Sequence, residues 1–170
     1  MPGKINRAAP AAERTPMIRP AKEEDIPCLI ALLEQVNRVH ALGRPDLFRP
    51  GTKYGPEELK AILRDPAAPV FVYEFDGGAA GYAFCRIKQA LHDRLLTDVK
   101  ELYIDDLCVD EKRRGQGIGR LLYEHVLAYA RETGCYHVTL NAWSLNPGAI
   151  RFYEKMGMKP MRITMEKILD

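Results

Sequence analysis

The order of elements in this chain is decided by a stretch in its middle, where residues 101–120 read ELYIDDLCVDEKRRGQGIGR. Its first part, residues 101–109, is rich in apolar side chains and predicts a strand. A turn with three glycines follows. The next residues form one stripe at helical spacing, which ends near Gly134 and consists of Ile118, Leu121, Leu122, His125, Val126 and Tyr129. The stretch therefore predicts a strand, a glycine-rich turn and a helix in direct succession.

The glycine-rich turn, residues 113–120, is suited to bind an anion. Glycines allow the backbone to approach a ligand closely, and a helix N-terminus offers free N–H groups and the positive end of the helix dipole. A dinucleotide-binding fingerprint requires glycine at its sixth place, where Arg120 stands, and the lysine of a nucleotide-hydrolase phosphate loop is absent. Two alternatives remain: a pyrophosphate loop of the form Arg/Gln-x-x-Gly-x-Gly/Ala, or a turn without a ligand.

Outside this stretch the sequence predicts short strands and helices in alternation. Strands are expected over residues 17–20, 70–75, 80–87, 136–143 and, with weak alternation, 161–168. Helices are expected from Ile26 to a loop over residues 40–53, and over residues 57–64 and 146–156. The resulting order, β-α-α-β-β-β-α-β-α-β, predicts an α/β fold in which one mixed sheet carries helices on its faces.

Length and composition favour one domain over residues 17–170. The chain has 170 residues, close to the roughly 150 of a single domain. Residues 1–16 are rich in alanine, proline and charge and lack periodicity, so we expect a disordered tail there. Lysine and arginine number 25 against 23 aspartates and glutamates, and this near-balance argues against a protein that coats nucleic acid.

No segment predicts a membrane span, a secretory signal or a metal site. The apolar runs fall short of the ~18 residues of a span, and the N-terminus lacks the apolar core of a signal peptide. The cysteines have neither zinc-ligand nor redox spacing; they are Cys28, Cys85, Cys108 and Cys135. We therefore expect a cytoplasmic protein with reduced thiols, no metal and no membrane partner.

Two separated motifs resemble the GNAT superfamily of acetyl-CoA-dependent N-acetyltransferases. The first is the strand ending at Val109 followed by Arg114-x-x-Gly117-x-Gly119. The second, about 30 residues further on, is Asn146-x-x-Ala149-x-x-Phe152-Tyr153-x-x-x-Gly157. The resemblance covers residues 17–165 and implies a single-domain GNAT fold, with a mixed, mostly antiparallel twisted sheet flanked by helices on both faces. It also implies acetyl-CoA as co-substrate.

The resemblance further implies which residues hold acetyl-CoA. The turn amides would bind the pyrophosphate, and the strand backbone would pair with the pantetheine arm. Asn146 would hydrogen-bond that arm, although a helix N-cap is an equally ordinary role for it. The implied cofactor-binding residues are Leu107, Cys108, Val109, Arg114, Gly115, Gln116, Gly117, Ile118, Gly119, Arg120, Asn146 and Ala149.

Acetyl transfer to an amine requires a base for the ammonium, a donor for the developing oxyanion and an acid for the leaving thiolate. The family tyrosine corresponds to Tyr153, which implies the acid, and the backbone N–H of Leu107 is the implied oxyanion donor. Asp105 and Asp106 are the candidate bases, and side-chain alternation is expected to place them on opposite faces of the strand. Asp105 is preferred because it matches the acidic residue of polyamine-type members; a structural salt bridge for either carboxylate is the alternative.

The expected function is N-acetylation of a primary amine on a small molecule. A protein or peptide amine is the alternative within that class, and a non-catalytic acyl-CoA-binding module is the alternative outside it. The loop from His40 to Phe48 is expected to border the acceptor pocket, made acidic by Asp46, Asp105 and Asp106. A homodimer is implied by the family alone.

Overall fold

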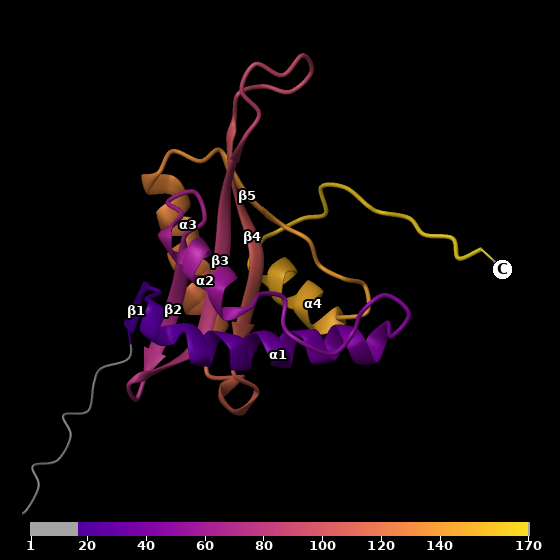
Figure 1. The fold of residues 1–170 in the computed structure, drawn as a ribbon. Coiled ribbons are helices and arrows are strands. Elements are labelled where there is room, and N and C mark those ends of the chain that lie inside the picture. The colour runs from indigo at the N-terminus through magenta and orange to yellow at the C-terminus, as the bar shows by residue number, and fades with distance from the viewer. Residues whose placement is uncertain (1–16, 170) are drawn as a thin grey trace, which may run out of the picture.

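The structure is a computed structural model that describes residues 17–169, so the expected tail at residues 1–16 lies outside the described residues. One five-stranded sheet has the order β1-β2-β3-β4-β5 (Figure 1). Strands β1 to β4 pair antiparallel with one another, and β5 runs parallel to β4. The elements are β1 (Met17–Pro20), α1 (Ile26–Gly43), α2 (Pro56–Arg64), β2 (Val70–Phe75), β3 (Gly78–Gln89), β4 (Lys100–Val109), α3 (Ile118–Glu132), β5 (His137–Leu140) and α4 (Pro147–Lys155).

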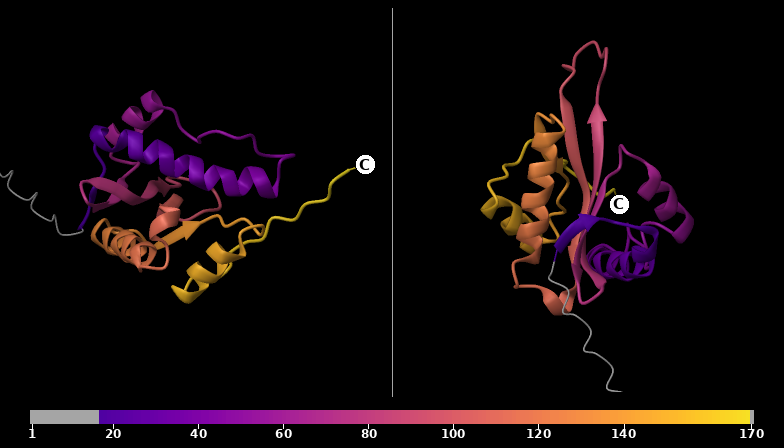
Figure 2. Two further views of the ribbon diagram at one scale, coloured as in Figure 1. Left: turned by 90° about the horizontal axis from the view of Figure 1, so that it is seen from below. Right: turned by 90° about the vertical axis from the view of Figure 1, so that its left-hand side faces the viewer.

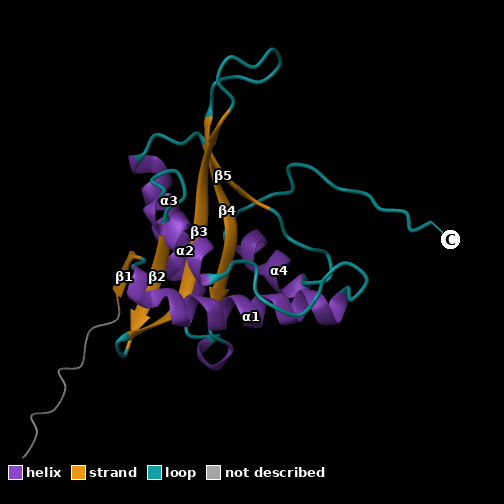
Figure 3. Ribbon diagram, in the orientation of Figure 1, coloured by secondary structure: helices purple, strands orange, loops and turns teal. Residues whose placement is uncertain are grey.

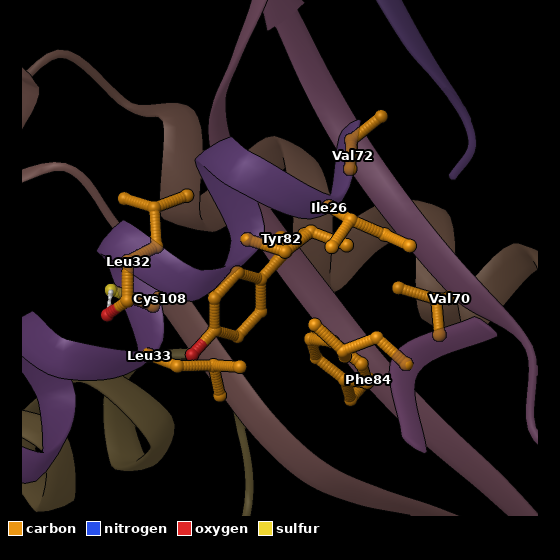
Figure 4. Packing of buried hydrophobic residues seen from close by; sticks show 10 residues of the cluster. Ile26, Leu32, Leu33, Val70, Val72, Tyr82, Phe84 and Cys108 are labelled. Carbon is orange, nitrogen blue, oxygen red and sulfur yellow. Dashed lines mark hydrogen bonds between the residues drawn. The ribbon is translucent and has the colours of Figure 1, made fainter. Parts of the chain in front are cut away.

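Helices cover both faces of the sheet, as predicted. Helices α1 and α2 lie on one face, and α3 and α4 lie on the other (Figure 2). Strand alternation produces this arrangement: Val70 and Val72 pack toward α1, whereas Phe71 between them packs toward α3. Figure 4 shows the first of these two cores, in which Tyr82 and Phe84 of β3 meet the leucines of α1.

Two element ends differ from the prediction by three residues or more, and the other ends differ by two residues at most. Helix α1 continues to Gly43 because no proline or glycine lies between Pro27 in its first turn and that glycine, and the Arg44 N–H still bonds to the His40 carbonyl. Strand β5 ends at Leu140 rather than at residue 143, since it has only four partners on β4. Within residues 17–169, no helix combines the length and the hydropathy that a membrane crossing needs.

The strand predicted over residues 161–168 is wrong. Residues 159–169 pair with no strand among the described residues, and they extend away from the sheet (Figures 1 and 3). A strand requires a neighbour that supplies its backbone hydrogen bonds, and weak alternation does not provide one. A bidentate ion pair holds this segment instead: Arg44 Nη1 and Nη2 donate to the Glu166 carboxylate at 2.8 and 2.9 Å.

A β-bulge in β4 changes the direction of its side chains. Phe84 of β3 lies opposite Asp106, and the next residue, Cys85, lies opposite Ile104, so Asp105 is the extra residue. Before the bulge, Ile104 packs toward α3; after it, Cys108 packs toward α1. The even-numbered side chains of β4 therefore lie on the α3 face of the sheet before Asp105 and on the α1 face after it.

Strands β4 and β5 are paired over a short stretch only. The ladder joins Glu101–Ile104 of β4 to His137–Leu140 of β5. Beyond it, β4 continues through residues 105–109, and no strand of the described chain pairs with that outer edge. The two strands thus separate at the level of the bulge, and the backbone edge of β4 is open to a ligand from this point onward.

Candidate functional site

A cavity of about 1020 Å³ occupies the space where β4 and β5 separate. Its walls come from the second half of β4, the turn before α3, the start of α4, the end of α1 and the loop over residues 48–53. All but one of the site residues expected from the sequence line it, namely Asp105, Asp106, Leu107, Cys108, Val109, Arg114, Gly115, Gly117, Ile118, Gly119, Arg120, Asn146, Ala149 and Tyr153. The exception is Gln116.

One end of the cavity is formed by the glycine-rich turn. Gly115 and Gly117 have φ angles of +78° and +83°, and a Cβ on either would meet no neighbour within 4 Å. Helix α3 starts directly after Gly117, and no side chain caps it. The amides of its first turn lack helical partners, so they face the cavity end as hydrogen-bond donors for an anion. This end therefore fits a pyrophosphate.

The three arginines of the turn are held by the protein itself. Arg114 Nε donates to the Val109 carbonyl at 3.1 Å. The Arg113 guanidinium lies over the Phe75 ring, 3.9 Å from its centroid. Arg120 pairs with Glu124 on the surface. Because each guanidinium already has a contact within the protein, the backbone amides are the principal hydrogen-bond donors of the turn, and the arginines contribute positive charge near it.

The bulge brings both aspartates of β4 to the cavity, so the expected placement on opposite faces is wrong. Asp105 accepts hydrogen bonds from Lys53 Nζ at 2.7 Å and from the Tyr54 hydroxyl at 2.6 Å. Burial raises the pKa of Asp105, but the bonds from Lys53 and Tyr54 outweigh it and leave that pKa below its ordinary value. Asp105 is therefore a fixed negative charge rather than a ready proton acceptor.

Asp106 has a different environment. Burial raises its pKa to about 6, and this exceeds the opposing effects of Lys53 and of the Tyr82 hydroxyl, which donates to Asp106 at 3.1 Å. A carboxylate with this pKa is mostly ionised at neutral pH and binds a proton more readily than an ordinary aspartate. Of the two neighbours, Asp106 is the better general base by pKa.

Tyr153 approaches the cavity from α4. Its ring packs against Tyr123 and Phe152 at centroid distances of 6.2 and 5.1 Å. Burial raises the pKa of the Tyr153 hydroxyl well above its ordinary value, and the charge of Asp106 adds to this effect. The hydroxyl has no hydrogen-bond partner among residues 17–169, so it is a protonated donor available to a ligand.

Helix α4 is positioned by Asn146, whose Oδ1 accepts a hydrogen bond from the Ala149 N–H at 3.1 Å. The predicted N-cap role is thus confirmed. Cys108 is poorly suited to act as a nucleophile. Its Sγ lies 3.7 Å from the Leu32 carbonyl oxygen (Figure 4), and burial raises the pKa of its thiol to about 12.

The two carboxylates accept hydrogen bonds from residues that the sequence did not single out as site residues. Lys53, Tyr54 and Tyr82 reach the carboxylates from a loop, its end and the neighbouring strand. No local motif marks them, since Tyr54 lies 51 residues from Asp105.

An aromatic cluster also lines the cavity. The His40 and Phe48 rings stack at 5.1 Å, and Phe48 meets Trp143 edge-on at 5.1 Å. All three line the cavity, and His40 and Phe48 are the first and last residues of the loop expected to border the acceptor. Asp46 does not: it bonds to Arg44 at 2.7 Å, outside the cavity, so its expected contribution to an acidic pocket is wrong.

Comparison of the sequence with known proteins finds acetyltransferases. The family model described as the acetyltransferase (GNAT) family matches residues 36–158. A glucosamine 6-phosphate N-acetyltransferase of Arabidopsis thaliana is 35% identical over 114 residues, which are 67% of this chain and 72% of that protein. The streptothricin acetyltransferase of Streptomyces lavendulae is 37% identical over 82 residues, which are 48% of this chain and 39% of that protein.

Among solved structures, a mutant of the BH1408 protein from Bacillus halodurans superimposes with a TM-score of 0.86 and 32% identity. The alignment covers 90% of this chain and 99% of that one.

Proposed function

The chain belongs to the GNAT acetyltransferase family, and on that premise we propose that it is an N-acetyltransferase that moves an acetyl group from acetyl-CoA directly to a primary amine of a small molecule. One observation carries the proposal. A single cavity joins an uncapped helix N-terminus, a carboxylate with a pKa of about 6 and a tyrosine that remains protonated. The names of two relatives, which act on glucosamine 6-phosphate and streptothricin, support a small-molecule acceptor.

In this proposal the glycine-rich turn and the open edge of β4 hold the co-substrate. The first-turn amides of α3 bind the pyrophosphate, and residues 107–109 offer backbone groups to the pantetheine arm. Acetyl-CoA, when bound, supplies an acetyl group as a thioester. The separation of β4 from β5 at the bulge supports this placement, because it opens the strand edge beside both carboxylates.

Asp106 is the proposed base. Its carboxylate takes one proton from the acceptor ammonium, which leaves a neutral amine able to attack. The sequence favoured Asp105, but Asp105 already accepts bonds from Lys53 and Tyr54. We assign Asp105 to binding: its fixed charge attracts the ammonium, and Lys53 competes with the acceptor for it.

Tyr153 is the proposed acid. When the carbon–nitrogen bond forms and the carbon–sulfur bond breaks, the Tyr153 hydroxyl gives its proton to the sulfur. The nitrogen loses a second proton in the same process, and this proton restores the tyrosine. Asp106 releases the first proton to solvent, so the reaction yields the amide, the free thiol and one proton. The high pKa of Tyr153 supports this role, since the hydroxyl is protonated before each turnover.

An amine panel tests the proposal. The protein is mixed with acetyl-CoA and with amino sugars, aminoglycosides, di- and polyamines, or lysine peptides, and released thiol is measured. We expect release with at least one small amine and a raised melting temperature with acetyl-CoA alone. Release with peptides alone would favour a protein amine as acceptor. A thermal shift without release from any amine would favour a non-catalytic acyl-CoA-binding module, and no shift at millimolar acetyl-CoA would overturn the co-substrate assignment.

The proposed compartment is the cytoplasm. The four cysteines are free thiols in the structure, which supports a reducing environment.

A further inference from the structure

One primary amine of the chain already lies in the cavity. Lys53, from the loop that joins α1 to α2 (Figure 1), is the single lysine among the described residues that line it. The Lys53 side chain is 44% exposed, and its Nζ donates to Asp105 Oδ2 at 2.7 Å. The chain thus places an ammonium of its own beside the carboxylate that is proposed to attract the acceptor.

The proposed base lies close to the same amine. Asp106 follows Asp105 directly, and both carboxylates reach the cavity because of the bulge. Burial raises the pKa of Asp106, and the positive charge of Lys53 is the strongest effect that opposes burial. Because such an effect weakens with distance, it indicates that the Lys53 ammonium is near the Asp106 carboxylate as well.

The Lys53 side chain is able to leave Asp105. Ion pairs that are partly exposed to water are weak, and this pair is of that kind. Lysine carries its ammonium on a flexible four-carbon stem, so Nζ can turn from Asp105 toward the open edge of β4. In the proposed function that edge, residues 107–109, holds the pantetheine arm, which ends in the thioester. The amine, the base and the thioester therefore share one small space.

We propose that Lys53 is an internal acceptor: when no amine substrate is bound, the protein transfers the acetyl group of bound acetyl-CoA to its own Lys53 Nζ. The inference rests on the proposed function and adds a modification site to it. Acetyl-lysine is neutral, so Asp105 then attracts a cationic acceptor without competition from Lys53.

The transfer uses the groups already assigned. The Lys53 ammonium gives one proton to Asp106, and the neutral amine attacks the thioester carbonyl. The carbon–nitrogen bond forms, the carbon–sulfur bond breaks, and Tyr153 gives its proton to the sulfur. The second proton of the nitrogen restores the tyrosine, and Asp106 releases the first to solvent. The products are acetyl-lysine, the free thiol and one proton.

Mass spectrometry of the protein after incubation with acetyl-CoA, without added amine, tests the proposal. We expect the intact mass to rise by one acetyl group, which peptide mapping places on Lys53. Lys60 is the matched internal control: its side chain is 38% exposed and its Nζ also bonds to a carboxylate at 2.7 Å, but it lies outside the cavity lining. Acetylation is expected to be at least about tenfold faster at Lys53 than at Lys60, because only Lys53 is held beside the thioester.

Three further measurements sharpen this test. The rate constant at Lys53 is expected to be independent of protein concentration, since the amine and the bound thioester belong to one complex. In urea-unfolded protein the rates at Lys53 and Lys60 become similar, because the cavity is lost. Lys53→Arg keeps a positive charge beside Asp105 but removes the primary amine, so thiol release without added amine falls to the background rate.

Three results would overturn the proposal. Equal rates at Lys53 and Lys60 in the folded protein would indicate chemical acetylation of exposed lysines. A rate constant that rises in proportion to protein concentration would show transfer between molecules. Absence of acetylation at Lys53 would also overturn it, and the amine panel, run on the same sample, then separates two cases: thiol release with a panel amine leaves the proposed function intact, whereas no release removes both.

Discussion

The two ends of the cavity are built in different ways. The end proposed to hold the cofactor is one continuous piece of chain, from the open edge of β4 through the glycine-rich turn to the start of α3. The end proposed to hold the acceptor is assembled from distant segments, because Asp105 accepts hydrogen bonds from Lys53 and Tyr54, which lie 52 and 51 residues away in the sequence. The first end follows from local sequence, whereas the second depends on tertiary packing, so substitutions at the two ends are expected to change different measurements.

The largest effect is expected at Tyr153, which lines the cavity. Tyr153→Phe removes the hydroxyl and keeps the ring, so we expect turnover to fall about 10²–10⁴-fold with unchanged acetyl-CoA affinity. Alkaline pH does not restore activity, because it supplies no acid. Tyr123→Phe, on a neighbouring ring outside the cavity lining, is the control and keeps full turnover. A Tyr153→Phe enzyme with normal turnover would remove Tyr153 from the chemistry.

The second-largest effects are expected at Asp105 and Asp106, and substitutions of these two residues should change different kinetic parameters. Below pH 6 the Asp106 carboxyl is protonated and accepts no proton, so kcat/KM rises with pH through about 6, where its pKa lies. Asp106→Asn lowers kcat/KM about 10²-fold, removes this low-pH limb and recovers activity at high pH, where solvent supplies neutral amine. Asp105→Asn keeps the limb and raises the acceptor KM. If Asp105→Asn alone loses the limb, the two roles are reversed.

At the end proposed to hold the cofactor, Gly117→Val is expected to weaken acetyl-CoA binding about tenfold, since Gly117 lines the cavity at the N-cap of α3 and has a positive φ. Gly134→Val is the matched control: that glycine also has a positive φ and open space around it, at the other end of α3. Both variants lose a similar amount of stability, but calorimetry should find weaker binding only for Gly117→Val. Equal affinity in the two variants would move the phosphate site elsewhere.

The smallest effect is expected at Lys53. Its exposed ion pair with Asp105 competes with the acceptor ammonium, so Lys53→Met lowers the KM of a cationic acceptor about twofold to fivefold. Lys60→Met, which removes a lysine paired with Glu57 on the surface, leaves KM unchanged. In an Asp105→Asn background the Lys53 effect disappears. A raised KM in Lys53→Met would show that Lys53 assists the acceptor.

The fold was largely predictable because most elements depend on local signals. The strands at Met17–Pro20 and Val70–Phe75 have the predicted bounds, and helix α2 starts one residue earlier than predicted and ends at Arg64 as predicted. The strand predicted near the C-terminus failed because alternation describes one strand and says nothing of its partner. The acceptor end escaped prediction for a related reason: the bulge at Asp105 follows from the register between β3 and β4, and a single strand does not reveal it.

The extra residue in β4 also acts as a phase shift. Before Asp105, the even-numbered side chains of β4 pack toward α3; after it, the even-numbered side chains pack toward α1. One strand thereby serves two cores, and the change of phase coincides with the proposed chemistry. Deleting a single residue between Ile104 and Leu107 would restore uniform alternation and exchange the faces of everything downstream, up to the start of the glycine-rich turn. The length of this short segment is therefore constrained as strictly as the identity of its side chains.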